Sequence, residues 1–153
     1  MDGKFKALIC DLSKKYKELM SMPPVTIDTI PPDCPTGGIY LFTENGIHLY
    51  AGRTKRRIKI RLRYHVSTAD DCPFAWHLAR EETGKTEATY KAEGSRKDLL
   101  TQSHFSQAYQ QAKNRIKQME VRYVGEPNPL KQTLLEIYVA VVSGAKFNDF
   151  DTH

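Results

Sequence analysis

Cysteine is scarce in this chain and does not occur in pairs. The three cysteines, Cys10, Cys34 and Cys72, are far apart and form no CxxC spacing. An odd number of widely spaced cysteines excludes a disulfide framework and a cysteine-based zinc site. We therefore expect a protein of a reducing compartment, the cytoplasm.

Long apolar runs and repeats are also lacking. No stretch approaches the roughly 18 apolar residues that a membrane span needs, and no apolar segment of the kind found in secretory signals follows the first residues. We therefore expect neither secretion through a signal peptide nor a membrane partner. With 153 residues, of which 40% are hydrophobic and 27% charged, the chain has the composition of one globular domain.

Basic residues are what the chain has in excess. Lys and Arg total 23 against 18 acidic residues, which gives a net charge of +5. Many of them crowd one short segment without an acidic residue, and such dense like charge favours a polyanion such as a nucleic-acid backbone as the partner. A solvated helix face or an anionic-membrane patch is the alternative. The candidate DNA-binding residues of this segment are Arg53, Lys55, Arg56, Arg57, Lys59 and Arg63.

Apolar spacing and proline predict one domain over residues 1–153. An amphipathic helix is expected over residues 1–22, followed by a proline-rich extended connector over residues 23–37. The core covers residues 38–148, and a helical elaboration occupies about residues 73–117. Within that elaboration we expect a loop from Thr83 to Ser95, with Ser95 as a helix N-cap, followed by one helix or two.

The core is expected to hold three strands. Two β-branched and aromatic runs, residues 38–42 and 47–51, flank Asn45-Gly46, a pair that favours a tight hairpin. Residues 120–124 alternate between polar and apolar types and predict the third strand. The fold class is therefore α+β, with a small, mainly antiparallel three-stranded sheet flanked by helices.

Two further helices are expected in the core. The basic segment from Lys55 to about His65 is predicted to be a helix that turns its arginines outward. The last helix begins at Pro129 and ends at Gly144. Because it is apolar on most sides, we expect it in the centre of the core.

The predicted hairpin and basic helix bring phosphate-binding side chains together. Tyr40 and Tyr50 fall on neighbouring strands and on the same face of the hairpin. Arg57, Arg61 and His65 recur every four residues, which makes one stripe along a helix with steps of about 6 Å. Guanidinium groups beside phenols are suited to binding a phosphate.

Several short motifs resemble those of the GIY-YIG nuclease family, and most closely its small type II restriction-enzyme branch. The motif residues are Gly38-Ile39-Tyr40, Tyr50-Ala51-Gly52, Arg61, His65, Glu136 and Asn148, in this order along the chain. They cover most of the sequence. There are two departures: Ala51 stands where the family has isoleucine, and the segment before Arg61 is about one residue longer than is common in the family. Arg57 and Arg63 therefore remain alternatives to Arg61 as the arginine that meets the phosphate.

The resemblance implies a metal-assisted hydrolysis of DNA phosphodiester bonds. Tyr40 would act as the general base for the attacking water, or would relay a proton to that base. Tyr50 and His65 would orient Tyr40 and the water or exchange protons with them. Arg61 would stabilise the pentavalent phosphorus. Because an unperturbed tyrosine has a pKa near 10, a base role for Tyr40 requires neighbouring positive charge, which the arginines supply.

Glu136 and Asn148 complete the candidate catalytic set. Glu136 is a carboxylate within an apolar stretch, which is unfavourable unless a partner pairs with it. The resemblance makes it the ligand of one Mg²⁺ or Mn²⁺, and a salt bridge to a buried arginine or exposure on the one wet face is the alternative. Asn148 hydrogen-bonds within the site or to the substrate backbone, or else it stabilises a turn in a polar tail.

Other functions remain open at this point. A nucleic-acid-binding module that keeps the fold without turnover is one, and a repair nuclease for branched or damaged DNA is another. RNA is not excluded as the substrate. The sequence contains no separate recognition domain, and a homodimer would match the two-fold symmetry of a palindromic site.

Overall fold

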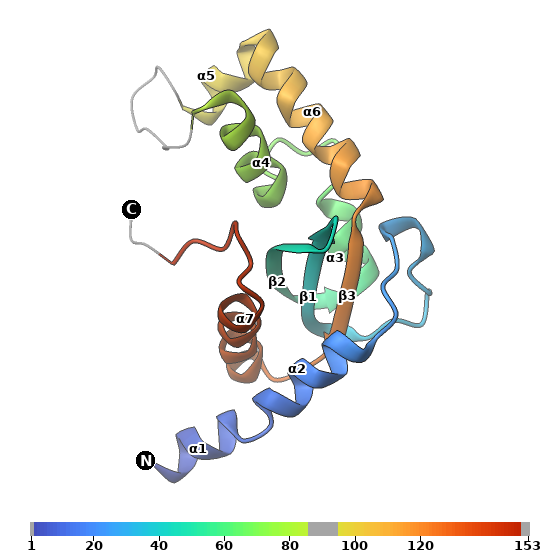
Figure 1. Ribbon diagram of the computed structural model, residues 1–153, viewed down its shortest axis with the longest axis vertical. Coiled ribbons are helices and arrows are strands. Elements are labelled where there is room, and N and C mark those ends of the chain that lie inside the picture. The colour runs from blue at the N-terminus through green and yellow to red at the C-terminus, as the bar shows by residue number, and fades with distance from the viewer. Residues whose placement is uncertain (1, 86–94, 151–153) are drawn as a thin grey trace. The chain divides into compact units, whose positions relative to one another are not determined.

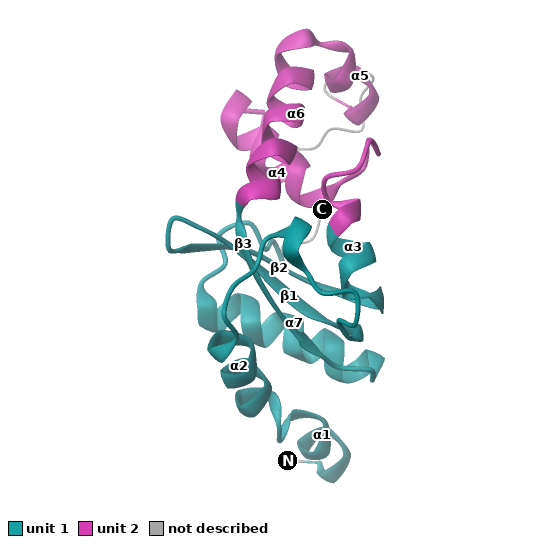
Figure 2. Ribbon diagram, turned by 90° about the vertical axis from the view of Figure 1, so that its right-hand side faces the viewer, with its two compact units in different colours: residues 1–62, 119–153 teal, residues 63–118 magenta. Residues whose placement is uncertain are grey.

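A computed structural model describes residues 2–85 and 95–150 and divides the chain into two compact units. We call residues 1–62 with 119–153 the sheet unit and residues 63–118 the helical unit (Figure 2). The predicted α+β class is confirmed, because the sheet unit holds three antiparallel strands flanked by helices. Most of the loop predicted between Thr83 and Ser95 lies outside the described residues.

The sheet has the order β2-β1-β3, and both pairs of neighbours are antiparallel (Figure 1). Its strands are β1 (Thr36–Glu44), β2 (Ile47–Arg57) and β3 (Glu120–Gly125). The predicted hairpin is confirmed: Asn45 and Gly46, between β1 and β2, have φ angles of 52° and 79°. These positive angles are those of a tight two-residue turn. Strand β2 is consequently an edge strand.

Helix α7 (Pro129–Ser143) packs against β1 and β2 and closes the core of the sheet unit (Figure 1). Helix α7 belongs to the core, as predicted, but only one of its sides is buried. Leu135 and Val139 are buried, whereas the exposed side of the helix carries Ile137 and Val141. A narrow sheet covers only one side of a helix, and apolar composition alone does not enforce burial.

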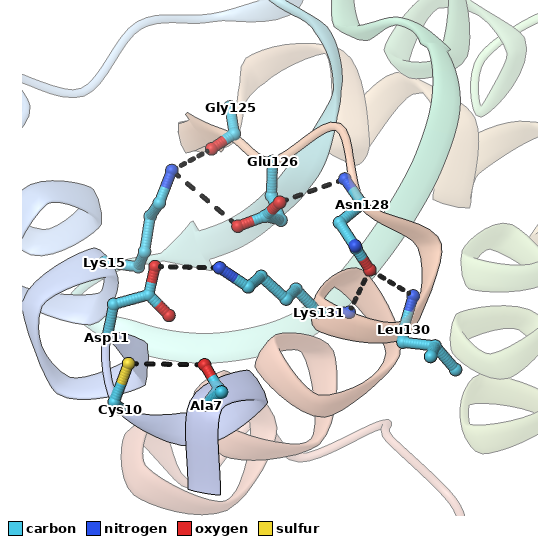
Figure 3. A network of polar contacts seen from close by, with 9 residues as sticks. All are labelled: Ala7, Cys10, Asp11, Lys15, Gly125, Glu126, Asn128, Leu130 and Lys131. Carbon is cyan, nitrogen blue, oxygen red and sulfur yellow. Dashed lines mark hydrogen bonds and ion pairs between the residues drawn. The ribbon is translucent and has the colours of Figure 1, made fainter. Parts of the chain in front are cut away.

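The N-terminal segment forms two helices rather than the one predicted. Helix α1 (Gly3–Ile9) ends before Asp11, and α2 (Leu12–Ser21) follows it. Asp11 leaves helical geometry, with a φ of −108° and a ψ of 7°. Its carboxylate forms an ion pair with Lys131 of α7 at 3.7 Å (Figure 3). The apolar spacing reveals neither this contact nor the break.

A polar network joins α2 to the loop between β3 and α7 (Figure 3). The Nζ of Lys15 donates to the carbonyl of Gly125 at 2.7 Å and lies 3.9 Å from the Glu126 carboxylate. The Asn128 side chain caps α7 by accepting from the main-chain N–H groups of Leu130 and Lys131. The N-terminal end of α7 is therefore fixed by side-chain contacts as well as by its apolar face.

The connector and the basic segment both contain structure that the sequence did not predict. The connector includes a 3-10 helix, η1 (Ile27–Thr29), and a bridge between Val25 and Val121 of β3. The predicted helix from Lys55 is wrong in its first part, because β2 continues to Arg57 and α3 covers only Ile58–Tyr64. Pairing of Arg57 with Thr36 of β1 holds that part of the chain in the sheet.

The helical unit contains α4 (Pro73–Thr83), α5 (Arg96–Thr101) and α6 (Ser103–Gln118). The stretch after Ser95 is therefore two helices, and the predicted N-cap is confirmed because the Ser95 hydroxyl accepts from the N–H of Asp98 at 3.2 Å. Trp76 is buried, with its ring centroid 5.0 Å from that of Phe105. Over the two described ranges, no helix combines the length and apolarity needed to cross a membrane.

Candidate active site

Tyr40 lies in the middle of β1 and is fully buried. It pairs with Gly52 of β2, and its ring occupies the space that a side chain at Gly52 would need. A Cβ atom built on Gly52 would lie 2.3 Å from the Tyr40 Oη and 2.4 Å from its Cζ, which is closer than real Cβ atoms approach a neighbour. The tyrosine of the first motif therefore explains on steric grounds why the second motif has a glycine at this position.

Tyr50 lies on the same face of the hairpin as Tyr40. The register pairs Tyr50 with Phe42 and Gly52 with Tyr40, so the two phenols are diagonal neighbours across β1 and β2. Phe42 lies on the same face of β1 as Tyr40, and its ring meets that of Tyr40 edge to face at 5.8 Å. The two phenols are close enough that Tyr50 raises the pKa of Tyr40.

Arg61 of α3 joins this pair from the same face of the sheet. Its Nε donates a hydrogen bond to the Tyr40 Oη at 3.3 Å. Burial raises the pKa of Tyr40, the Tyr50 phenol raises it further, and the Arg61 guanidinium opposes them without prevailing. Burial, followed by the Glu136 carboxylate, raises the pKa of Tyr50 to about 12. Both phenols are thus protonated at neutral pH, because desolvation outweighs the arginine that we expected to favour the phenolate.

Glu136 approaches from α7, on the opposite side of β2. Alternation along β2 places Ala51 and Arg53 toward α7, and Ala51 belongs to the core that includes Leu135. The Arg53 Nε lies 3.9 Å from the Glu136 Oε1, and both side chains are partly exposed. Burial raises the pKa of the Glu136 carboxyl, while Arg53 and Arg61 oppose the shift. Glu136 therefore does have an arginine partner, but Arg53 is exposed rather than buried as the alternative interpretation had it.

Asn148 binds the main chain of β2. Its Oδ1 accepts from the Ala51 N–H, and its Nδ2 donates to the Ala51 carbonyl, both at 2.8 Å. The preceding residue continues the pairing, because the Phe147 N–H donates to the Leu49 carbonyl at 2.8 Å. The segment after α7 therefore covers the outer edge of β2. Asn148 holds the strand between Tyr50 and Gly52, a role that the spacing of the sequence did not indicate.

The predicted helical stripe of Arg57, Arg61 and His65 is wrong. Arg57 belongs to β2, and its Nη1 donates to the Pro32 carbonyl at 2.5 Å. His65 follows the last residue of α3, lies in the helical unit and is buried. Arg61 is therefore the arginine that meets the phenols within the sheet unit. Arg63 also belongs to the helical unit.

The remaining basic residues lie mostly at the surface. Arg53, Lys55, Arg56, Arg57 and Arg63 are exposed, and Lys59 is half-buried. In the sheet unit these residues cluster at the end of β2 and the start of α3, next to the phenols and Glu136. The structure therefore brings a basic surface and the candidate catalytic side chains to one strand.

The donor set limits the kind of metal site that can form here. Among the described residues, no three His, Cys, Asp or Glu side chains gather into a group that could hold an ion. Mg²⁺ is often held by one or two carboxylates, waters and substrate phosphates. Glu136, a half-buried carboxylate near two phenols, fits such a shared site and does not fit a cage built from protein alone.

Comparisons with known proteins do not add a relative. No protein-family model matches this chain, and neither a curated protein nor a solved structure matches it. Function is therefore inferred from the residues and their geometry.

Proposed function

We propose that this protein is a divalent-metal-dependent endonuclease that hydrolyses DNA phosphodiester bonds. The observation that carries the proposal is the convergence of Tyr40, Tyr50, Arg61 and Glu136 on β2. They come from β1, β2, α3 and α7, and each is linked electrostatically to at least one other. Four polar groups, one of them a fully buried phenol, are costly to gather unless they bind or transform a ligand.

Arg61 is the group that would stabilise the transition state. A guanidinium keeps its charge and offers a planar fork to phosphate oxygens as negative charge develops on them. The hydrogen bond from Nε to Tyr40 Oη orients the Arg61 side chain before substrate arrives. Preorganisation of this kind avoids a reorganisation cost during the reaction.

Tyr40 would serve as a proton relay rather than as a standing phenolate, because its raised pKa keeps it protonated at neutral pH. As the water oxygen attacks phosphorus, Tyr40 Oη takes the water proton and passes its own phenolic proton to a phosphate oxygen. The bond from phosphorus to the leaving oxygen breaks, and the proton just placed on the phosphate oxygen moves to the leaving oxygen. Tyr50, whose pKa is raised to about 12, keeps its proton and would donate a hydrogen bond to the substrate.

Glu136 would hold a single Mg²⁺ or Mn²⁺ ion. When bound, that ion would neutralise charge on the phosphate and on the leaving oxygen. Arg53, the present partner of Glu136, would remain beside the substrate as a second positive charge. Asn148 would act as a positioning residue, because its amide contacts the main chain of β2.

The test is cleavage of supercoiled plasmid, branched DNA, single-stranded DNA and RNA, with Mg²⁺, Mn²⁺ or EDTA. We expect cleavage of DNA that EDTA stops and that Tyr40→Phe, Arg61→Ala and Glu136→Gln abolish. Melting curves verify that each variant is folded. Retained cleavage in all three folded variants would overturn the proposal. Discrete plasmid fragments would indicate a restriction-like enzyme, in which case the oligomeric state should be a homodimer, whereas cutting of branched DNA alone would indicate repair.

A second candidate is a nucleic-acid-binding module without turnover. Two observations favour it: the Tyr40 phenol is held protonated, and the Glu136 carboxylate is already paired with Arg53. This candidate expects a salt-sensitive mobility shift and no cleavage with any divalent ion.

A further inference from the structure

A pocket lies beside Arg53, at the end of β2. Its volume is about 490 Å³. It is lined by Thr36, Gly37, Arg53, Thr54, Lys55, Pro127, Pro129 and Gln132. This volume falls within the range of about 300–1,000 Å³ that is typical of small-molecule sites, so a nucleotide-sized group fits.

The charge of the pocket comes from two residues of one strand. Arg53 and Lys55 are two positions apart on β2, so they lie on the same face, about 7 Å apart along the strand. Arg53 lies within ion-pair distance of Glu136. Across the part of the chain that the structure describes, Lys55 has no ion-pair or hydrogen-bond partner for its ammonium group. The lining contains no carboxylate, so the pocket favours an anion.

The remaining walls are suited to a sugar. Pro127 and Pro129 contribute rings without N–H donors, and Gly37 contributes no side chain. The Gln132 amide donates to the Glu126 carbonyl at 2.6 Å, which fixes this wall to the loop before α7. The pocket therefore combines a cationic side with a rigid, mainly apolar side.

We propose that this pocket receives the nucleotide adjacent to the scissile phosphodiester, with Lys55 contacting the phosphate of that nucleotide. This inference rests on the proposed function. Glu136, the proposed metal ligand, lies 3.9 Å from Arg53. Lys55 follows Arg53 on the same face of β2, about 7 Å further along the strand. The Pro127 and Pro129 rings pack against the sugar.

The test compares Lys55→Gln with Lys17→Gln, which removes the same charge from an exposed position of α2 outside the pocket. Substrates carry one neutral methylphosphonate at each phosphate near the cut in turn. We expect Lys55→Gln to raise KM by about tenfold, with kcat nearly unchanged. The slope of log Kd against log salt should fall by about one. A methylphosphonate at one flanking phosphate should raise the KM of the parent in the same way. The same substrate should not raise the KM of Lys55→Gln any further.

Two outcomes would overturn the inference. One is a Lys55→Gln effect no larger than that of Lys17→Gln. The other is that, at every position, the methylphosphonate raises the KM of Lys55→Gln by the same factor as it raises the KM of the parent. Either result leaves cleavage dependent on Glu136 in place, so failure of the pocket and failure of the nuclease proposal are separate. If the parent binds DNA without cutting it, the same comparison is made on Kd alone.

Discussion

Arg61 and Tyr40 are joined by a hydrogen bond of 3.3 Å from Nε to the phenol oxygen. This bond links α3 to the centre of the sheet and aims the guanidinium. We predict that Tyr40→Phe lowers kcat by at least about 100-fold, since the charge on Arg61 is kept while its orientation is lost. Arg61→Lys should lower kcat at least as much as Tyr40→Phe, because an ammonium group lacks the planar fork of a guanidinium and its Nε donor. Tyr16→Phe, on α2, is the matched control and should retain activity in the same cleavage assay.

The raised pKa values of the phenols predict a loss of stability at alkaline pH. In the unfolded chain a tyrosine ionises near pH 10. In the folded protein Tyr50 keeps its proton until a pKa of about 12. Between these values the folded state binds more protons, so the free energy of unfolding falls as pH rises. Urea unfolding from about pH 9 to 11 should show a shallower decline in Tyr50→Phe than in the parent. Equal declines would contradict the burial of the Tyr50 phenol.

Glu136 should limit stability while supporting activity. Burial raises the pKa of its carboxyl in the folded protein, so the stability that this group contributes at low pH is lost as pH rises through that pKa. At neutral pH the ionised carboxylate therefore costs stability. We predict that Glu136→Gln melts at the same temperature as the parent or higher at pH 7, and that the gain shrinks as the pH is lowered toward about 4. A markedly lower melting temperature at pH 7 would show instead that the ion pair with Arg53 stabilises the fold.

Asn148 provides a test of how the β2 edge is held. In Asn148→Asp, one carboxylate oxygen still accepts from the Ala51 N–H, and the other faces the Ala51 carbonyl. We expect a loss of about 1–3 kcal/mol in the free energy of unfolding at pH 7. Acid pH should restore part of this loss, because a protonated carboxyl donates again. Asn114→Asp, at an exposed site on α6, should cost little in the same measurement. Equal costs at the two sites would rule out a special role for Asn148.

Gly52 tests the steric link between the two tyrosine motifs. Gly52→Ala places a methyl group against the Tyr40 ring, so the ring or the strand must move. Overpacking of this kind typically costs about 1–3 kcal/mol, and the displaced phenol should also lower cleavage. Gly3→Ala is the control, because a Cβ there meets no atom within 4 Å. Unchanged melting and activity in Gly52→Ala would mean that the ring is not held over the glycine.

Local chemistry explains which parts of the fold were predictable. Asn45-Gly46 specifies a turn through its own backbone preferences, and Pro129 and Gly144 mark the ends of α7 in the same local way. The ion pair between Asp11 and Lys131 was not predictable, because the two residues are distant in sequence. The extension of β2 to Arg57 depends likewise on its pairing with Thr36. These contacts arise only in the folded chain.

The candidate site was predictable in composition and less so in electrostatics. The motifs selected Tyr40, Arg61 and Glu136, which the structure brings together around β2. They did not indicate that burial would outweigh Arg61 at the phenol, because desolvation depends on the packing around the ring. Nor did they identify Arg53 as the partner of Glu136, since alternation and register across two elements set that distance.

The sheet unit is assembled from two separate stretches of sequence, and this division sets the order in which the site is made. During synthesis the tyrosines and Arg61 leave the ribosome first, then the whole helical unit, and only afterwards Glu136 and Asn148. The nascent chain therefore carries Arg61 well before the carboxylate that the proposed cleavage requires. If the proposed function holds, the chain is inert toward the nucleic acids around the ribosome until its last helix has been translated.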